Sequence, residues 1–190
     1  MLRTFYPEPK TTIRSKSHKV YPYLLKGIEI RRPNQVWASD ITYIPLKHGF
    51  AYLVSIIDLY SRKILSWNLS NSLDKTFCTE ALDEAIERYG IPEIFNSDQG
   101  SQFISNEFTE TLLIKNIQIS MDSKGRAIDN IYIERYWRTL KYEDIYLNKY
   151  ETMTEARIGI NKFTHFYNVQ RVHSSLEYKT PDEIYYNIVT

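Results

Sequence analysis

One stretch decides the fold: Asn96-Ser97-Asp98-Gln99-Gly100-Ser101-Gln102-Phe103, where an acid and a glycine turn follow a largely apolar run. That run, Ile91 to Phe95, predicts a strand that presents the Asp98 carboxylate at its carboxyl end. In open α/β sheets, ligands bind at this edge. A carboxylate there is either a helix cap or part of a metal or catalytic site, and the local sequence leaves both open. Other carboxylates at matching places would favour the site.

The rest of the chain alternates between strand and helix patterns. Runs rich in β-branched and aromatic residues predict strands at 37–44, 50–58, 63–69, 93–97 and 117–121. Apolar residues at helical spacing predict helices from an Asp74 cap to Tyr89, and over 106–115, 130–146 and 154–169. Thr180-Pro181-Asp182-Glu183 is typical of a capping box and predicts a last short helix.

This order predicts an α/β fold. A meander of three antiparallel strands is followed by parallel strands joined through helical crossovers, which gives a five-stranded mixed sheet flanked by helices. Ribonuclease H-like folds have this order. The composition agrees, because 43% apolar and 25% charged residues in 190 are normal for a globular chain with a core. With a single cysteine, Cys78, and neither a membrane-span nor a signal-peptide pattern, we expect a cytoplasmic protein.

Two further carboxylates fall at matching places. Asp40 lies inside the first predicted strand, which neighbours the fourth in a sheet of this order, and Glu134 lies one turn into the long helix that returns across the same edge. Three acids that converge in this way repel one another unless cations lie between them. Oxygen ligands without a His or Cys cluster suit Mg²⁺ or Mn²⁺. Two such ions can clamp the attacking and leaving oxygens of a phosphodiester.

The long helix also has a polar stripe, Asn130, Glu134, Arg138 and Lys141, opposite its apolar face. The stripe is either an ordinary solvated face with a Glu–Arg pair or a site that joins a metal-binding acid to cations for phosphate. The helix alone favours the solvated face.

Four motifs in order resemble those of the catalytic cores of retroviral integrases and insertion-sequence transposases. They are Trp37-x-x-Asp40-x-Thr42-Tyr43, Asp98-x-Gly100-Ser101-x-Phe103, Asp129-Asn130-x-x-x-Glu134 and Tyr167-Asn168-x-x-Arg171-x-His173-x-x-Leu176-x-Tyr178-x-Thr180-Pro181. Thirty-five residues lie between Asp98 and Glu134, the spacing of the family's "DDE" motif. The last motif is similar to that of the IS-three transposase family, of the orfB type.

The resemblance implies a bacterial, nucleoid-associated DDE transposase that hydrolyses a phosphodiester and drives strand transfer, with two Mg²⁺ or Mn²⁺ ions held by Asp40, Asp98 and Glu134. Lys141 matches a basic residue that the family uses at DNA, and Arg138 and Asn130 would assist it. The partners would be element terminal repeats, target DNA and further copies of the chain, at least as a dimer. A ribonuclease H-like nuclease without strand transfer, and a truncated non-catalytic DNA-binding or inhibitory remnant, remain alternatives.

The charge distribution and the family's domain layout together divide the chain in two. Residues 1–32 hold eight Lys and Arg against two acids, while the whole chain has a net charge of +1. Such a segment is either a solvated tail or an arm that neutralises phosphates. Because similar proteins carry helix-turn-helix segments first, we expect 1–32 to be a basic arm, the remnant of a DNA-binding region, and 33–190 to be the catalytic core.

Several other polar residues compete for functional roles. Asp58 at a strand end is expected to fix the following turn, with Arg62 as its partner. Asp122 is expected to face solvent and Asp129 to cap a helix. Ser101 has no His at a partner spacing and is not a nucleophile candidate. Arg171 and His173 are interpreted as structural, with contact to DNA as the alternative.

Overall fold

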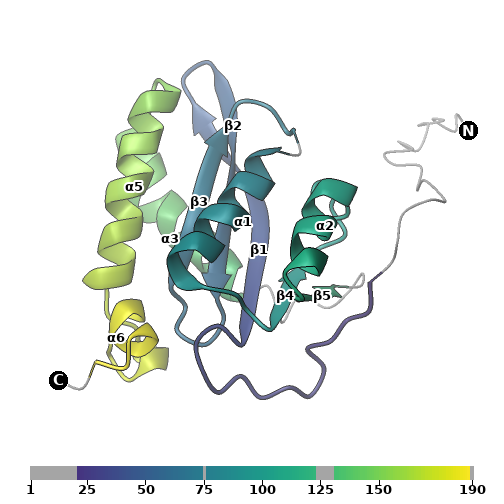
Figure 1. The fold of residues 1–190 in the computed structure, drawn as a ribbon. Helices are drawn as coiled ribbons and strands as arrows, with labels where there is room; N and C mark the ends of the chain where they lie inside the picture. Colours follow the sequence, from purple (N-terminus) through teal and green to yellow (C-terminus); the bar gives the residue numbers. More distant parts are fainter. Residues whose placement is uncertain (1–20, 75, 123–130, 189–190) are drawn as a thin grey trace, which may run out of the picture.

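The computed structural model describes residues 21–74, 76–122 and 131–188, which form one sheet with helices on both faces (Figure 1). The sheet has the order β3-β2-β1-β4-β5. Its strands are β1 (Val36–Leu46), β2 (Gly49–Asp58), β3 (Ile64–Ser70), β4 (Ile94–Ser97) and β5 (Gln118–Met121). β1 pairs antiparallel with β2 and parallel with β4, and β4 pairs parallel with β5. The predicted five-stranded mixed sheet is confirmed, with the first and fourth strands side by side.

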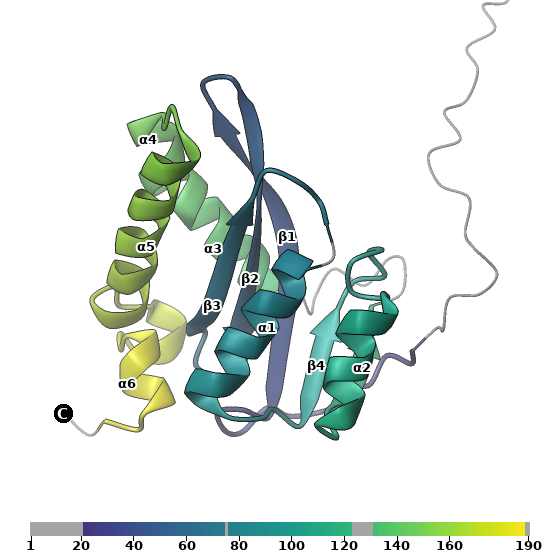
Figure 2. The ribbon, with the colours of Figure 1, turned by 45° about the horizontal axis from the view of Figure 1, so that its top comes forward.

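Helices cover the sheet in two groups. Their bounds are α1 (Thr76–Tyr89), α2 (Asn106–Ile114), α3 (Ile131–Leu140), α4 (Tyr146–Asn148), α5 (Met153–Val169) and α6 (Pro181–Tyr185). In Figure 2, α1 and α2 lie on the near face of the sheet and α3 lies behind it. Two buried clusters follow from this layering: one joins α1 and α2 to one face, and the other joins α3 and α5 to the opposite face. Successive side chains of β1 point to opposite faces of the sheet, so β1 contributes to both clusters: Val36 and Ala38 pack with α3 and α5, and Trp37 packs with α1 and α2.

The helix that carries Glu134 is interrupted by a π-helical segment, Lys141–Ile145, between α3 and α4. A single helix from 130 to 146 was expected, so the prediction missed this change of winding. The segment buries Asp144, whose carboxylate accepts hydrogen bonds from Asn148 Nδ2 at 2.9 Å and from Tyr150 Oη at 3.0 Å. Polar groups that are buried need such partners, and the π turn brings Asp144 to them.

The predicted caps are confirmed. Asp74 Oδ1 accepts hydrogen bonds from the backbone of Thr76 at 3.1 Å and of Phe77 at 3.2 Å, which satisfies donors at the start of α1. Thr180 and Glu183 form the expected reciprocal capping box of α6.

Part of the segment assigned to a basic arm lies against the sheet edge. The backbone of Met121 donates to the Pro22 carbonyl oxygen at 3.2 Å, the backbone of Leu24 donates to Ser120 Oγ at 3.0 Å, and Leu25 is buried. Residues 21–25 therefore cover the free edge of β5. Among the described residues, no helix has the length and apolar character needed to cross a membrane.

Candidate active site

The register of the two central strands aligns two of the predicted carboxylates. Val36 pairs with Ile94 and Ala38 with Asn96, in parallel. Asp40 comes two residues further along β1, on the same face as Ala38 because strand side chains alternate, and Asp98 directly follows β4, two residues after Asn96. Asp40 in the middle of β1 is therefore level with the turn at the carboxyl end of β4 that carries Asp98, where the sequence places a ligand site.

Asp40 is half-buried and held by the long helix. Trp137 Nε1 donates a hydrogen bond to Asp40 Oδ2 at 3.0 Å. Burial raises the pKa of the Asp40 carboxyl, the hydrogen bond from Trp137 opposes that rise, and the charges of Asp98 and Glu134 raise the pKa further. Both acids thus lie within electrostatic reach of Asp40, so the three predicted carboxylates converge from three elements.

Glu134 reaches this edge because α3 packs by its other face. Ile133, Tyr136 and Trp137 are buried, whereas Glu134 in the first turn of α3 is exposed. Trp137 follows Glu134 by three residues and bonds to β1 through Asp40, so one turn of helix fixes the direction of both side chains.

The Asp98 carboxylate is exposed and caps its own turn. Its Oδ1 atom accepts a hydrogen bond from the backbone of Gly100 at 2.9 Å. A Cβ on Gly100 would lie 2.8 Å from the same oxygen, so any other residue would crowd the carboxylate. With Asp98 turned this way, no three acidic, His or Cys side chains in the described part of the chain form a group able to hold a metal ion. The cap is thus real, and it leaves the second carboxylate oxygen of Asp98 toward solvent.

The three predicted DNA-binding residues have different surroundings. Lys141 Nζ donates to Thr42 Oγ1 at 2.7 Å, two residues from Asp40 on β1. Burial lowers the pKa of Lys141, and the charge of Asp40 opposes this, so the ammonium group lies near that carboxylate. Arg138 is exposed and lines a separate cavity beside α3. Asn130 lies outside the described residues.

Asp122 was predicted to face solvent, and this is wrong. It is half-buried beside Asn96, whose Nδ2 atom donates to Asp122 Oδ1 at 3.2 Å. Burial raises the pKa of Asp122, and the charge of Asp98 adds to the rise. Ser120 pairs with Asn96, so Asp122 is level with Asp98 at the end of β5. Strand order and alternation together could have identified this fourth carboxylate.

The structure revises or leaves open the other candidates. Asp58 does fix its turn, since Oδ1 accepts from the backbone and the hydroxyl of Ser61 at 2.8 and 2.7 Å. Arg62 is its partner through the backbone, since the Arg62 N–H donates to the Asp58 carbonyl oxygen at 2.9 Å, whereas the Arg62 guanidinium carbon lies 3.2 Å from the centre of the Tyr132 ring. Ser101 is exposed and bonds to the Gln102 side chain. Asp129 lies outside the described residues.

The donor set fits a hard divalent cation. Asp40, Asp98 and Glu134 offer carboxylate oxygens, which Mg²⁺ and Mn²⁺ prefer. Burial is the main cause of the raised pKa of Asp40, and the charges of Asp98 and Glu134 add to it, so a cation between the carboxylates would stabilise the charged form of Asp40. Asp98 would have to turn one oxygen from Gly100 toward Asp40, and its exposure leaves room for that rotation.

Family models and curated proteins match nearly the whole described chain. Two models, both described as the integrase core domain, match residues 30–127 and 115–181. The transposase for insertion sequence element IS904 of Lactococcus lactis is 39% identical over 80% of this chain and 61% of its own length. The putative transposase InsK of IS150 from Escherichia coli is 29% identical over 84% of this chain and 57% of its own length. The chain thus spans about three-fifths of the length of these curated relatives.

Solved structures share the fold. The HTLV-2 integrase catalytic core domain in complex with magnesium, in its dimeric form, is 26% identical with a TM-score of 0.65, over 81% of this chain and 97% of that chain. A simian T-cell lymphotropic virus intasome in complex with PP2A regulatory subunit B56 gamma matches with a TM-score of 0.70 at 22% identity, over 90% of this chain and 60% of that chain. Together these likenesses confirm the ribonuclease H-like fold.

Proposed function

We propose a function from one premise: the chain belongs to the integrase core domain family. It acts as a DDE transposase core, which hydrolyses a DNA phosphodiester and then joins the freed 3′ end to a target strand: the 3′-hydroxyl attacks a target phosphodiester, and the target's own 3′ oxygen leaves. The observation that supports this proposal is that Asp98 and Glu134, from two other elements, act electrostatically on the half-buried Asp40, whose pKa is raised first by burial and then by these two charges.

Each residue of the site has a distinct task in this proposal. Asp40 and Asp98 would hold both Mg²⁺ or Mn²⁺ ions, and Glu134 would complete the second site. Two bound ions supply the charge that activates the attacking oxygen and stabilises the leaving oxygen. The protein's part is therefore positioning. The Trp137 indole fixes the Asp40 carboxylate at 3.0 Å, and Thr42 orients the Lys141 ammonium toward a backbone phosphate.

The finer identity of the chain also belongs to the proposal. The C-terminal motif from Tyr167 to Pro181 supports the proposal that the chain is of the IS-three family and the orfB type, with the element's terminal repeats and target DNA as substrates. Acting at two DNA ends requires at least two copies of the chain. The basic arm at 1–32 adds sequence-independent attraction to phosphates, and a nucleoid location follows from DNA as the partner.

The direct test compares wild type with Asp98→Asn. Asparagine keeps an oxygen to accept from the backbone of Gly100, so the turn is preserved while the charge is lost. A duplex ending in the element's terminal repeats is incubated with Mg²⁺ or Mn²⁺, and nicked and joined strands are separated on a denaturing gel. We expect both products with wild type and neither with Asp98→Asn.

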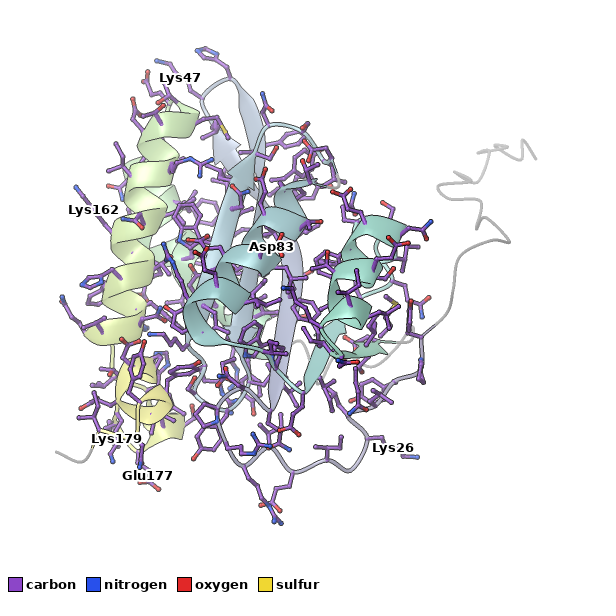
Figure 3. All side chains as sticks on the ribbon, in the orientation of Figure 1. Lys26, Lys47, Asp83, Lys162, Glu177 and Lys179 are labelled. Carbon is purple, nitrogen blue, oxygen red and sulfur yellow. The ribbon has the colours of Figure 1, made fainter. Side chains whose placement is uncertain are left out.

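The matched control is Asp83→Asn, which removes the same charge from an exposed position on α1 (Figure 3). It should retain full activity. Equal activity of wild type and Asp98→Asn would refute the assignment. Nicked strands without joined strands would indicate a nuclease, and DNA binding without any cleavage would indicate a non-catalytic remnant.

A further inference from the structure

A basic cavity lies beside α3, separate from the carboxylates. Its volume is about 580 Å³, within the range of ligand pockets. We call it the arginine pocket, because the charged side chains that line it are Arg62, Arg135, Arg138, Arg171 and Glu143. They come from the turn after β2, from α3 with its π-helical continuation, and from the segment after α5. Parts far apart in the sequence thus bring four guanidinium groups together.

The positive charge of the arginine pocket is only partly compensated. Glu143 forms an ion pair with Arg171. Arg62, Arg135 and Arg138 form no ion pair within the described part of the chain. Burial lowers the pKa of the Arg62 guanidinium, and the charge of Arg135 lowers it further. Like charges held together in a partly desolvated place favour an anion between them.

Six buried side-chain atoms have no hydrogen-bond partner among the described residues, and two of them are nitrogen atoms of residues that line this pocket. They are Arg62 Nε and His173 Nε2. The Arg62 side chain is held flat on the Tyr132 ring, and the His173 ring packs edge-on against Tyr167 with centroids 4.9 Å apart. Unpaired buried polar atoms are costly and rare, so two on one wall indicate a site that is completed by a ligand.

We propose that the arginine pocket binds a backbone phosphate of DNA at a position away from the reacting phosphodiester. Planar guanidinium groups bind phosphate with two parallel hydrogen bonds, and the pocket is lined by arginines and by no lysine. The inference rests on the proposed function for the identity of the ligand. Arg138 lies one turn after Glu134 on α3, so a strand held at the carboxylates can continue over this helix into the pocket. Arg171 and His173, interpreted from sequence as structural, thereby acquire a role in binding.

The test measures the salt dependence of DNA binding without metal. Fluorescence anisotropy of a labelled duplex is recorded at several NaCl concentrations in EDTA, for wild type and Arg62→Gln. Losing one phosphate contact should weaken binding severalfold and lower the magnitude of the slope of log affinity against log salt by about 0.9. The control Lys162→Gln removes an exposed charge on α5, away from the pocket, and should leave the slope unchanged (Figure 3).

A second variant keeps the test decisive if Arg62→Gln fails to fold. Arg135 is exposed, so Arg135→Gln removes pocket charge without opening the core, and it should also lower the slope. Wild-type slopes in every folded pocket variant would overturn the proposal. The proposal would also be overturned if the pocket substitutions weakened the binding of an acidic peptide or of inorganic phosphate but left the binding of DNA unchanged. The binding assay needs no catalysis. If wild type failed to cleave DNA but the pocket variants still had a lower slope of log affinity against log salt, the proposed reaction would be refuted and the pocket would remain a DNA-binding site.

Discussion

Gly159→Ala should destabilise the protein although helix propensity predicts the reverse. Gly159 is buried in α5, where an added Cβ would lie 1.7 Å from Tyr150 Oη and 2.2 Å from its Cζ. Ordinary contact begins near 3.4 Å, so the Tyr150 ring must leave its place. Tyr150 Oη donates to both oxygens of the buried Asp144 carboxylate at 3.0 Å, and this interaction ties the loop before α5 to the π-helical segment after α3.

The competing energies can be compared. Alanine in place of glycine inside a helix stabilises by about 1 kcal/mol. Overpacking costs about 1–3 kcal/mol, and a lost hydrogen bond to a charged group about 1.5–3 kcal/mol. The net effect of Gly159→Ala is therefore a loss of about 1.5–5 kcal/mol in the free energy of unfolding.

Urea unfolding followed by circular dichroism measures this loss. The informative control is the same change in a Tyr150→Ala background, where the three atoms nearest the new Cβ are gone. There, Gly159→Ala should be neutral or stabilising by up to about 1 kcal/mol. The reasoning would be refuted if Gly159→Ala were as stable as wild type. It would also be refuted if Gly159→Ala changed the free energy of unfolding in the same direction with Tyr150 and with Ala at position 150.

Three further predictions concern other contacts. Trp137→Phe keeps a buried ring but removes the hydrogen-bond donor to Asp40. Metal-dependent cleavage should therefore fall about 10–100-fold while the thermal unfolding temperature changes little. Full activity of this variant would contradict the positioning role of Trp137. Asp182→Asn leaves the buried Lys63 ammonium without its carboxylate partner and should lower the free energy of unfolding in urea by about 3 kcal/mol. A decrease of less than about 1 kcal/mol would disprove this prediction. Burial and then nearby arginines lower the pKa of His173 in the folded protein. As the pH decreases below about 6.5, His173 of the unfolded chain therefore takes up a proton before His173 of the folded protein does, and the free energy of unfolding should fall. The fall should end below the pKa of His173 in the folded protein. His173→Gln should remove this component, and identical pH dependences would exclude it.

The sequence predicts the fold well because local signals agree with strand order, and the same signals lead to the proposal of the three carboxylates. The strand before Asp98, the alternation around Asp40 and the helical position of Glu134 each follow from short patterns. Once β1 and β4 are neighbours, their parallel register brings Asp40 and Asp98 level without further information.

Other features depend on contacts between distant segments. Asp122 is half-buried because β5 lies beside β4, and nothing around it in the sequence indicates Asn96 as a partner. The Arg62 side chain packs on Tyr132 of α3 and does not form an ion pair with the Asp58 carboxylate, four residues away. The π turn likewise depends on Tyr150, which returns to the Asp144 carboxylate only after the chain reverses. Periodicity within one segment cannot predict these choices.

The indole that holds Asp40 also gives the site an optical reporter. Of the three tryptophans, Trp37 is fully buried and bonds to the Asn34 side chain at 2.9 Å, and Trp67 lies on β3. Trp137 alone touches a candidate metal ligand, through its polarisable N–H group. A cation that draws electron density from Asp40 changes the field along this indole, so its emission should respond to binding. The chain thus carries a built-in fluorophore whose spectrum follows occupation of the site before any DNA is cut.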